Sequence, residues 1–379
     1  MRVLVTGLRG IPDIQGGVET HAQQLYPLLA ARGIEVCVIC RSPFWSPLIG
    51  RSWRGVVLKK IWAPKLRGLE AFLHTLLSVL YAGVVRPNIL HVHAIGPGLF
   101  VPLARLLGLT VVFTHHGADY EREKWGAFGK TVLRVGEQFA VRFANASICI
   151  SRTIQRSVAL MGSANTFLIP NGVPAPDRRA AGTEIQNLGL SPGRYVLLVS
   201  RFVPEKRHID LIRAFRVAAM DGWKLVLVGG HVEHDPYYAT VRSAAAGDPN
   251  VVFAGQKTNA ALCEIYSNAG IFVLPSSHEG LPIALLEALS YGLSVLVSDI
   301  EPHKEIGMAE GCYFRMGDVE SLASSLRQIA SGHGLWETPA YRSEWVMSRY
   351  CWRTIADETA RLYVSQGKER QGEEKGSLN

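Results

Sequence analysis

Short apolar runs alternate with longer amphipathic segments along most of the chain. The runs have the length of buried strands, and the longer segments repeat apolar residues at helical spacing, as Leu25, Leu28 and Leu29 do. This alternation predicts parallel sheets with helices on both faces. In the first half we predict strands at 2–6, 36–39, 89–92, 111–114 and 146–150, and helices at 18–32, 69–85, 99–107 and 131–143.

The alternation stops at a polar stretch with Pro and Gly, 174–193, and then restarts. We therefore predict two doubly wound α/β domains that face each other across a cleft, with ligands beyond the carboxyl ends of the strands. The predicted parts are a first domain at 1–176, a second domain at 177–345, a helical segment at 346–366 and a disordered tail at 367–379. Strands of the second domain are predicted at 195–200, 224–228, 251–253, 271–274 and 294–298.

Composition excludes a disordered chain, because 48% of the 379 residues are hydrophobic and only 19% are charged. The charge is uneven: residues 1–180 hold 21 Lys and Arg against 9 Asp and Glu, whereas 181–379 hold 19 against 23. A basic first half predicts an anionic partner, such as a membrane surface or a lipid phosphate, or else a solvated basic surface. Nucleic acid is disfavoured, since no recognition motif is present and aromatic residues do not interleave with the basic ones.

The apolar runs and the cysteines predict a cytoplasmic protein. The longest apolar stretch, 71–85, is shorter than the roughly 20 residues of a membrane-spanning helix, and no signal peptide is visible. The six cysteines do not form a secreted disulfide framework. Cys37 and Cys40 lie three apart on a predicted strand and thus point to opposite faces, which disfavours a joint metal site. We expect a protein that rests on the inner membrane without crossing it.

The segment 275–288 carries the strongest chemical signal. It places Glu279 directly after a predicted strand and Glu287 in the second turn of the following helix. The amides of Gly280 and Leu281 then face the positive end of the helix dipole, which suits a diphosphate. A carboxylate there would repel phosphate, so Glu279 is expected to bind hydroxyl groups attached to it. Glu287 either binds ligand or is a solvated helix residue.

Two cations, Arg201 and Lys206, follow the first strand of the second domain. At a strand end they are suited to neutralise a leaving diphosphate, and the alternative is a basic surface turn. In the first domain, His115 and His116 end another strand and are equally compatible with catalysis or structure. No Asp-x-Asp and no cluster with metal-ligand spacing occurs, so we predict no metal requirement.

The loop 7–17 after the first strand is too long for a dinucleotide-binding fingerprint. No acidic residue ends the second strand, so a nicotinamide dehydrogenase is disfavoured. Gly16 and Gly17 nevertheless place bare backbone amides at a helix start, with Glu19 in its first turn. This turn either binds phosphate or a sugar oxygen, or is an ordinary turn that glycine permits.

Together these segments resemble the family-4 retaining glycosyltransferases of the GT-B fold, and in particular those of bacterial surface polysaccharides. Each motif is weak alone, but their order along residues 1–365 is that of the family. One departure is Arg207, since a Gly commonly follows the Lys of the basic loop. The matching motifs are Gly16-Gly17-x-Glu19, His116-Gly117, 169–173, Arg201 with Lys206, and Glu279-(x7)-Glu287 in Ser-x-x-Glu-Gly-Leu-Pro.

The resemblance implies an enzyme that moves a hexosyl unit from a UDP- or GDP-sugar to a lipid-linked or oligosaccharide acceptor, with retention and without a metal. In the second domain, Glu279 would contact sugar hydroxyls and Glu287 the ribose. The amides of Gly280 and Leu281 would lie nearby.

By the same resemblance, Arg201 and Lys206 would hold the diphosphate, Gly17 would lie near it, and His116 would lie near the transferred sugar. The segment 346–366 would cross back onto the first domain, which takes the acceptor. The basic character of the first domain fits a lipid diphosphate and an anionic membrane surface. The residues expected to be catalytic are His116, Arg201, Lys206 and Glu279.

Two alternatives to the transferase remain at this point. A nucleotide-sugar epimerase of the same architecture would convert the donor without an acceptor. A non-catalytic nucleotide-sugar-binding subunit would bind the donor without turnover, although such a subunit has no need of both Arg201 and Lys206.

Overall fold

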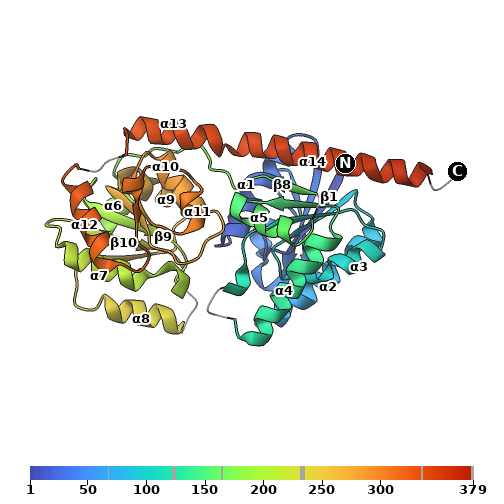
Figure 1. Cartoon of the computed structure of the whole chain (residues 1–379), viewed down its shortest axis with the longest axis horizontal. Helices are drawn as coiled ribbons and strands as arrows, with labels where there is room; N and C mark the ends of the chain where they lie inside the picture. The colour runs from blue at the N-terminus through green and yellow to red at the C-terminus, as the bar shows by residue number, and fades with distance from the viewer. Residues whose placement is uncertain (67, 122–124, 164, 231–234, 334–335, 377–379) are drawn as a thin grey trace. The chain divides into compact units, whose positions relative to one another are not determined.

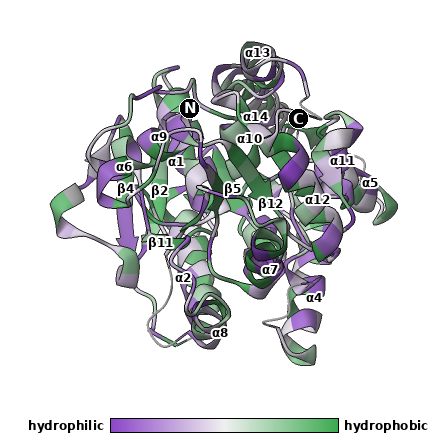
Figure 2. Ribbon diagram, turned by 90° about the vertical axis from the view of Figure 1, so that its left-hand side faces the viewer, coloured by the Kyte–Doolittle hydropathy of each residue, from purple (hydrophilic) through white to green (hydrophobic). Residues whose placement is uncertain are grey.

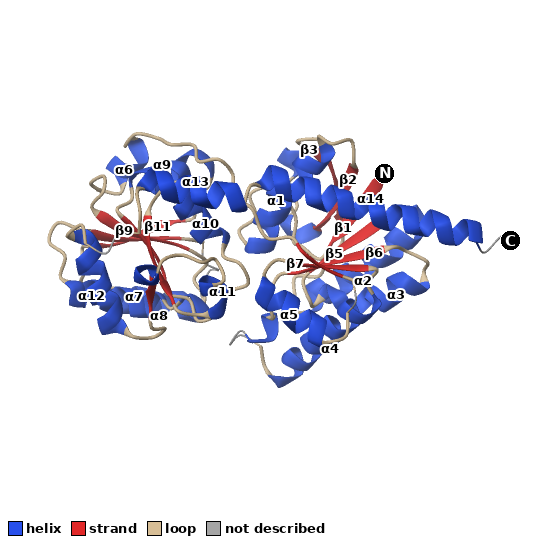
Figure 3. Ribbon diagram, turned by 45° about the horizontal axis from the view of Figure 1, so that its top comes forward, coloured by secondary structure: helices blue, strands red, loops and turns tan. Residues whose placement is uncertain are grey.

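The structure is a computed structural model that describes residues 1–66, 68–121, 125–163, 165–230, 235–333 and 336–376. The chain divides into two compact units. Unit 1 comprises Met1–Gly172 and Trp352–Asn379, and unit 2 comprises Val173–Cys351, against predicted boundaries at 176 and 345. In each unit a layer of strands lies between layers of helices (Figure 3), which is the doubly wound arrangement that the sequence predicts.

The sheet of unit 1 has eight strands in the order β3-β4-β2-β1-β5-β6-β7-β8. Neighbouring strands are parallel except for the short antiparallel pair of β3 and β4. The strands β5, β6 and β7 are buried along their whole length, as expected for apolar runs covered on both faces. Strand bounds are β1 Arg2–Thr6, β2 Glu35–Arg41, β3 Ser52–Trp53, β4 Val56–Ile61, β5 Ile89–His93, β6 Val111–His115, β7 Ala146–Cys149 and β8 Thr166–Leu168.

The helices of unit 1 come from distant parts of the sequence. Helices α1 and α14 pack against each other although they lie at opposite ends of the sequence (blue and red in Figure 1). The α14 residues Trp352, Ile355 and Tyr363 share one hydrophobic core with Val3 and Leu25. Helix bounds are α1 Gly17–Ala30, α2 Leu69–Val85, α3 Val101–Leu106, α4 Ala127–Phe143, α5 Arg152–Leu160 and α14 Trp352–Gly376, with short 3₁₀ turns η1 Ser42–Phe44, η2 Pro47–Ile49, η3 Pro97–Phe100 and η4 Asp119–Glu121.

The C-terminal helix differs from the sequence prediction in its bounds. The predicted segment 346–366 is divided between α13, Pro339–Arg349, in unit 2 and α14 in unit 1. Helix α14 then continues to Gly376, whereas a disordered tail was expected from 367. The polar residues 367–376 include Glu, Lys, Gln and Arg, which are good helix formers, and no Pro interrupts them. Residues 377–379 lie outside the described residues.

The sheet of unit 2 has six parallel strands in the order β11-β10-β9-β12-β13-β14. Its central strands are uniformly apolar, as β12 shows in Figure 2. Helices α7 and α12 pack together, as do α10 and α13, and Figure 3 shows the two pairs on opposite faces of the sheet. Strand bounds are β9 Tyr195–Val199, β10 Lys224–Val228, β11 Val251–Gly255, β12 Ile271–Leu274, β13 Ser294–Ser298 and β14 Tyr313–Phe314.

The helices of unit 2 are formed by amphipathic segments. Helix α7 is one example, since it buries Leu211, Ile212 and Phe215 along one face. Among the described residues, no helix of either unit has both the length and the hydropathy needed to span a membrane. Helix bounds are α6 Thr183–Asn187, α7 His208–Ala218, α8 Pro236–Ala244, α9 Asn259–Asn268, α10 Ile283–Ser290, α11 Glu301–Lys304 and α12 Val319–Ala330, with 3₁₀ turns η5 Pro204–Lys206 and η6 Glu310–Cys312.

Each sheet reverses its strand order at one point. In unit 1 the chain moves outward from β1 to β2 and β4, and then returns to place β5 on the other side of β1. In unit 2 the same reversal lies between β9 and β12. The loops that leave such a pair of strands diverge to opposite faces of the sheet. The carboxyl ends of the two strands are therefore the usual ligand-binding position of an open parallel sheet.

Candidate functional site

The strongest candidate site of unit 2 is built from the loops that follow β9 and β12. The Ser277 amide donates to the Glu205 carbonyl at 2.9 Å and ties the two loops together. Lys206 donates through Nζ to Oε1 of Glu279, and the Ser276 hydroxyl donates to the same oxygen at 2.7 Å. The structure thus brings together Lys206 and Glu279, which lie 73 residues apart in the sequence.

The charges of this pair compensate each other. The side chains of Lys206 and Glu279 are 16% and 10% exposed. Burial acts to raise the pKa of the Glu279 carboxyl, but the Lys206 ammonium and the hydrogen bonds bring that pKa below its ordinary value. The carboxylate is therefore ionised at neutral pH. The position of Glu279 suggests that its carboxylate repels phosphate, but the Lys206 ammonium offsets this repulsion. The carboxylate oxygens of Glu279 can then accept hydrogen bonds from hydroxyl groups.

Three further predicted residues, Arg201, Gly280 and Leu281, lie on the same two loops. Arg201 stands between β9 and η5, next to Phe202, whose ring stacks on that of His208 at 4.6 Å. Gly280 and Leu281 directly precede α10, which begins at Ile283. The start of α10 thus faces the loop that holds Glu279, and its dipole favours negative charge there.

Arg207 stands where the family commonly has Gly, yet the turn that carries Lys206 is kept. Its backbone has φ of 50° and ψ of 42°, the left-handed conformation that glycine adopts at no steric cost. Its guanidinium is paired with Asp210. The Lys206 amide still donates to the Val203 carbonyl at 3.0 Å, so the turn closes with Arg in place of Gly.

Glu287 has a different environment from Glu279. It lies in the second turn of α10 and accepts a hydrogen bond from the Tyr266 hydroxyl at 3.0 Å. Burial raises the pKa of Glu287 to about 7. It is therefore not a fully solvated helix residue, which was one of the two sequence interpretations. Its binding of a ribose stays a prediction.

In unit 1 the predicted glycine turn lies at the start of α1. Gly16 has φ of 153°, and a Cβ there would lie 2.1 Å from Oε2 of Glu19. Glu19 forms an ion pair with Arg9, with 2.9 Å between Oε1 and Nε. A Cβ on Gly17 would meet no atom within 4 Å. Gly16 is therefore required by the packed Arg9–Glu19 pair, whereas the position of Gly17 has open space beside it.

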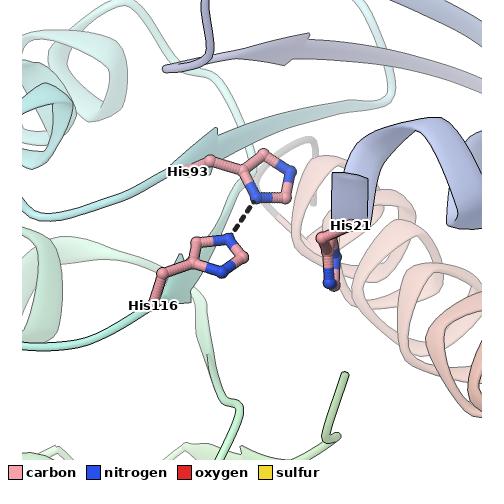
Figure 4. Close-up of side chains that lie close together, drawn as sticks. All are labelled: His21, His93 and His116. Carbon is pink, nitrogen blue, oxygen red and sulfur yellow. Dashed lines mark hydrogen bonds between the residues drawn. The ribbon is translucent and has the colours of Figure 1, made fainter. Parts of the chain in front are cut away.

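The two adjacent histidines after β6 have separate partners. His115 contacts Glu137, with 2.7 Å between Nε2 and Oε1, and accepts the Gly117 amide at Nδ1. His116 instead contacts His93, with 2.8 Å between its Nε2 and Nδ1 of His93. His21 lies beside both (Figure 4). Burial lowers the pKa of His116 well below its ordinary value, so its ring is neutral at physiological pH.

Sequence reasoning did not identify His21 and His93. His93 follows His91 with one residue between them on β5, so both side chains point to the same face. Two histidines on the same face of a buried strand were the sequence signal that could have identified His93. His21 carries no such local signal, because it is a single polar residue within the amphipathic helix α1.

Two family models match the chain. The model described as "Glycosyltransferase Family 4" matches residues 15–175, and the model described as "Glycosyl transferases group 1" matches residues 183–343. The first match covers Gly17 and His116, and the second covers both loops of the Lys206–Glu279 pair.

Curated relatives and solved structures agree with these matches. The chain is 26% identical over 332 residues to a GDP-mannose:cellobiosyl-diphosphopolyprenol alpha-mannosyltransferase of Komagataeibacter xylinus, covering 84% of this chain and 77% of the relative. It is 27% identical over 259 residues to a UDP-Gal:alpha-D-GlcNAc-diphosphoundecaprenol alpha-1,3-galactosyltransferase of Escherichia coli, covering 64% and 66%.

The fold is shared with sucrose-phosphate synthase from Thermosynechococcus elongatus, with a TM-score of 0.82, 21% identity and coverage of 96% of this chain and 98% of that one. It is also shared with Anabaena HepE in complex with UDP and glucose, with a TM-score of 0.78, 17% identity and coverage of 96% and 99%.

Proposed function

Because the chain belongs to the family-4 glycosyltransferases of the GT-B fold, we propose that it moves a hexosyl unit from a UDP- or GDP-sugar to a lipid-linked or oligosaccharide acceptor in bacterial surface-polysaccharide synthesis. The two curated relatives described above use a GDP-sugar and a UDP-sugar by name, and both act on a diphospho-lipid acceptor by name. These names support the class of donor and acceptor and leave the choice of sugar and carrier open.

One observation carries this proposal: the Lys206–Glu279 pair at the strand reversal between β9 and β12. A nucleoside diphosphate sugar presents a diphosphate and several hydroxyl groups side by side. The pair offers an ammonium donor for the first and carboxylate acceptors for the second. We assign Arg201 to the diphosphate as well, and the Gly280 and Leu281 amides to the anion at the start of α10.

The proposed reaction retains the anomeric configuration. The bond between the anomeric carbon and the diphosphate oxygen breaks, and the acceptor hydroxyl attacks on the same face. Its proton passes to the leaving phosphate. Arg201 and Lys206 stabilise the charge that develops on the diphosphate, so neither a metal nor a pair of carboxylates is required.

Three further assignments rest on the family resemblance. Glu287 is assigned to the ribose, Gly17 with Gly16 to the diphosphate, and His116 to the transferred sugar. The partly buried Glu287 carboxyl suits a ribose, since it accepts hydroxyl donors. The neutral His116 ring suits a hydroxyl group of the sugar, because a neutral imidazole has one nitrogen that accepts a hydrogen bond.

The direct test is product analysis in EDTA. The wild-type protein is incubated with a panel of UDP- and GDP-hexoses and polyprenyl diphosphate acceptors. We expect one donor to give an acceptor that is heavier by one hexosyl unit, a free nucleoside diphosphate, and an NMR signal with the donor's anomeric configuration. A donor isomer of unchanged mass would instead indicate an epimerase, and bound donor with no product would indicate a binding subunit.

A surface of unit 1 supports the proposal of peripheral membrane association. The end of β4 and the start of α2 expose apolar side chains beside lysines: Trp62 is 58% exposed and Leu66 is 62% exposed, and Lys60 and Lys65 are exposed. An apolar group flanked by lysines is suited to an anionic lipid interface. Arg67, which belongs to the same basic stretch, lies outside the described residues.

Replacing Lys59, Lys60 and Lys65 by Gln is expected to weaken binding to vesicles with anionic lipid about 100-fold at low salt, since each cation contributes about 1 kcal/mol. Vesicle co-sedimentation measures the change. The matched control removes three exposed cations from unit 2, by replacing Arg194, Arg213 and Lys304 with Gln. Equal loss in both triple variants, or no loss in either, would contradict a membrane-binding surface at β4 and α2.

A further inference from the structure

Three histidines from distant parts of the sequence meet at the strand reversal of unit 1. His21 lies in α1, His93 is the last residue of β5, and His116 directly follows β6 (Figure 4). One ring nitrogen of each lies within 4.8 Å of the others. Within the part of the chain that the structure describes, no other group of three or more His, Cys, Asp or Glu side chains gathers in this way.

The outer nitrogens of two rings are hydrogen-bonded, which orients the inner nitrogens. Nδ1 of His21 donates to Oδ1 of Asn171 at 2.9 Å, so Nε2 of His21 keeps its lone pair. That Nε2 atom is buried and has no hydrogen-bond partner. Nε2 of His93 contacts the Tyr26 hydroxyl, while its Nδ1 faces Nε2 of His116. Metal-binding imidazoles are held in this manner, with the second nitrogen bonded to an oxygen.

We propose that His21, His93 and His116 together bind one divalent transition-metal ion, represented by Zn²⁺, with a water in the fourth position. Neutral imidazoles without a carboxylate favour Zn²⁺, Co²⁺, Ni²⁺ or Cu²⁺ over Mg²⁺ and Ca²⁺. Burial supplies the neutral form, because it lowers the pKa of His21 to about 4 and that of His93 well below its ordinary value. His116 is partly exposed, which gives the ion a route from solvent.

Binding requires the three rings to move. Tetrahedral Zn²⁺ with Zn–N bonds of about 2.0–2.1 Å holds its nitrogens about 3.4 Å apart. The 2.8 Å contact between His93 and His116 must open, and the more distant ring nitrogens must close in. The proton shared by His93 Nδ1 and His116 Nε2 moves to the outer nitrogen of the ring that carries it. Three neutral imidazoles thus stay neutral, and no net proton is released.

The three histidines share one residue with the proposed donor site, since His116 is also assigned to the transferred sugar, whereas the Lys206–Glu279 pair lies in unit 2. Metal binding is measured on the full chain without donor or acceptor. Its failure would leave the transferase proposal unaffected, because that proposal requires no metal. Product analysis in EDTA tests the proposed function and is read separately from the Zn²⁺ titration.

The test is a titration of the chelator-treated wild-type protein with ZnCl₂ by calorimetry, together with the visible absorption of the CoCl₂-loaded protein. We expect one Zn²⁺ per chain and the intense cobalt bands of a tetrahedral site. His21→Gln keeps a polar group of similar size and is expected to weaken Zn²⁺ binding at least 100-fold. Asn171→Ala leaves all three rings in place and is expected to weaken it about 10- to 100-fold.

The matched control is His74→Gln. His74 is also fully buried and has unpartnered ring nitrogens, but it is not one of the three histidines. It is expected to bind Zn²⁺ as tightly as the wild type. The proposal is overturned if His21→Gln binds Zn²⁺ as tightly as the wild type. The absence of tetrahedral cobalt bands in the wild type would also overturn it, and that measurement stands even if a variant does not fold.

Discussion

Replacing Lys206 by Ala is expected to lower kcat/KM for sugar transfer by about 10²–10³-fold, the usual effect of removing one group that stabilises developing negative charge. The effect has two sources. The variant loses the ammonium that would face the leaving diphosphate. It also leaves the Glu279 carboxylate, which is 10% exposed, without its ion-pair partner and next to the phosphate.

Initial rates and thermal melting with UDP and GDP, both in EDTA, measure this effect. A nucleotide at about 100 times its dissociation constant stabilises the wild type by about 2.7 kcal/mol, and the variant is expected to lose most of that stabilisation. Lys257→Ala is the matched control, because Lys257 is also ion-paired in unit 2, with Glu184. Wild-type turnover in Lys206→Ala, or an equal loss in Lys257→Ala, would contradict the assignment of Lys206 to the donor.

Replacing Trp352 by Ala is expected to lower the free energy of unfolding by about 3–5 kcal/mol. The Trp352 side chain is 4% exposed and belongs to the core of unit 1. It lies so close to the chain at Gly172 that a Cβ there would be 2.5 Å from the indole ring. Truncation leaves a large cavity between α14 and the rest of unit 1.

Urea and thermal unfolding of the full chain measure the loss. Trp62→Ala is the matched control, because the Trp62 side chain is 58% exposed, and a change within about 0.5 kcal/mol is expected there. Equal and small changes in the two variants would show that Trp352 does not anchor α14 to the core of unit 1.

Most of the strands that the sequence predicted are buried along the greater part of their length. The runs at 2–6 and 271–274 are continuous apolar segments, and the structure confirms them as β1 and β12. It adds β3, β4, β8 and β14, which were not predicted. Strand β4 carries exposed Lys59 and Lys60, so its hydrophobic signal is broken. Strand β8 has only three residues, and β3 and β14 have two each, too few to show a period.

Arg201, Lys206 and Glu279 could be predicted because each lies in a loop that follows a buried strand. Motif order identified Lys206 and Glu279 separately, and the adjacency of β9 and β12 then placed both at one end of the sheet. Their ion pair was not predicted. The sequence argument considered only that Glu279 would repel phosphate and did not place Lys206 beside it. The lowered pKa of Glu279 arises from the ammonium that the fold brings to it.

By itself the sequence determined the two doubly wound units, the family and the residues at the strand ends of unit 2, because hydrophobic period and local motifs are properties of neighbouring residues. Only the tertiary structure decided which distant side chains meet. The cluster of His21, His93 and His116 is the clearest case. Its members come from a helix, a strand end and a loop, with no common spacing. The strand reversal at β1 and β5 gathers them, because it brings the carboxyl ends of separate strands and the start of α1 to one edge of the sheet.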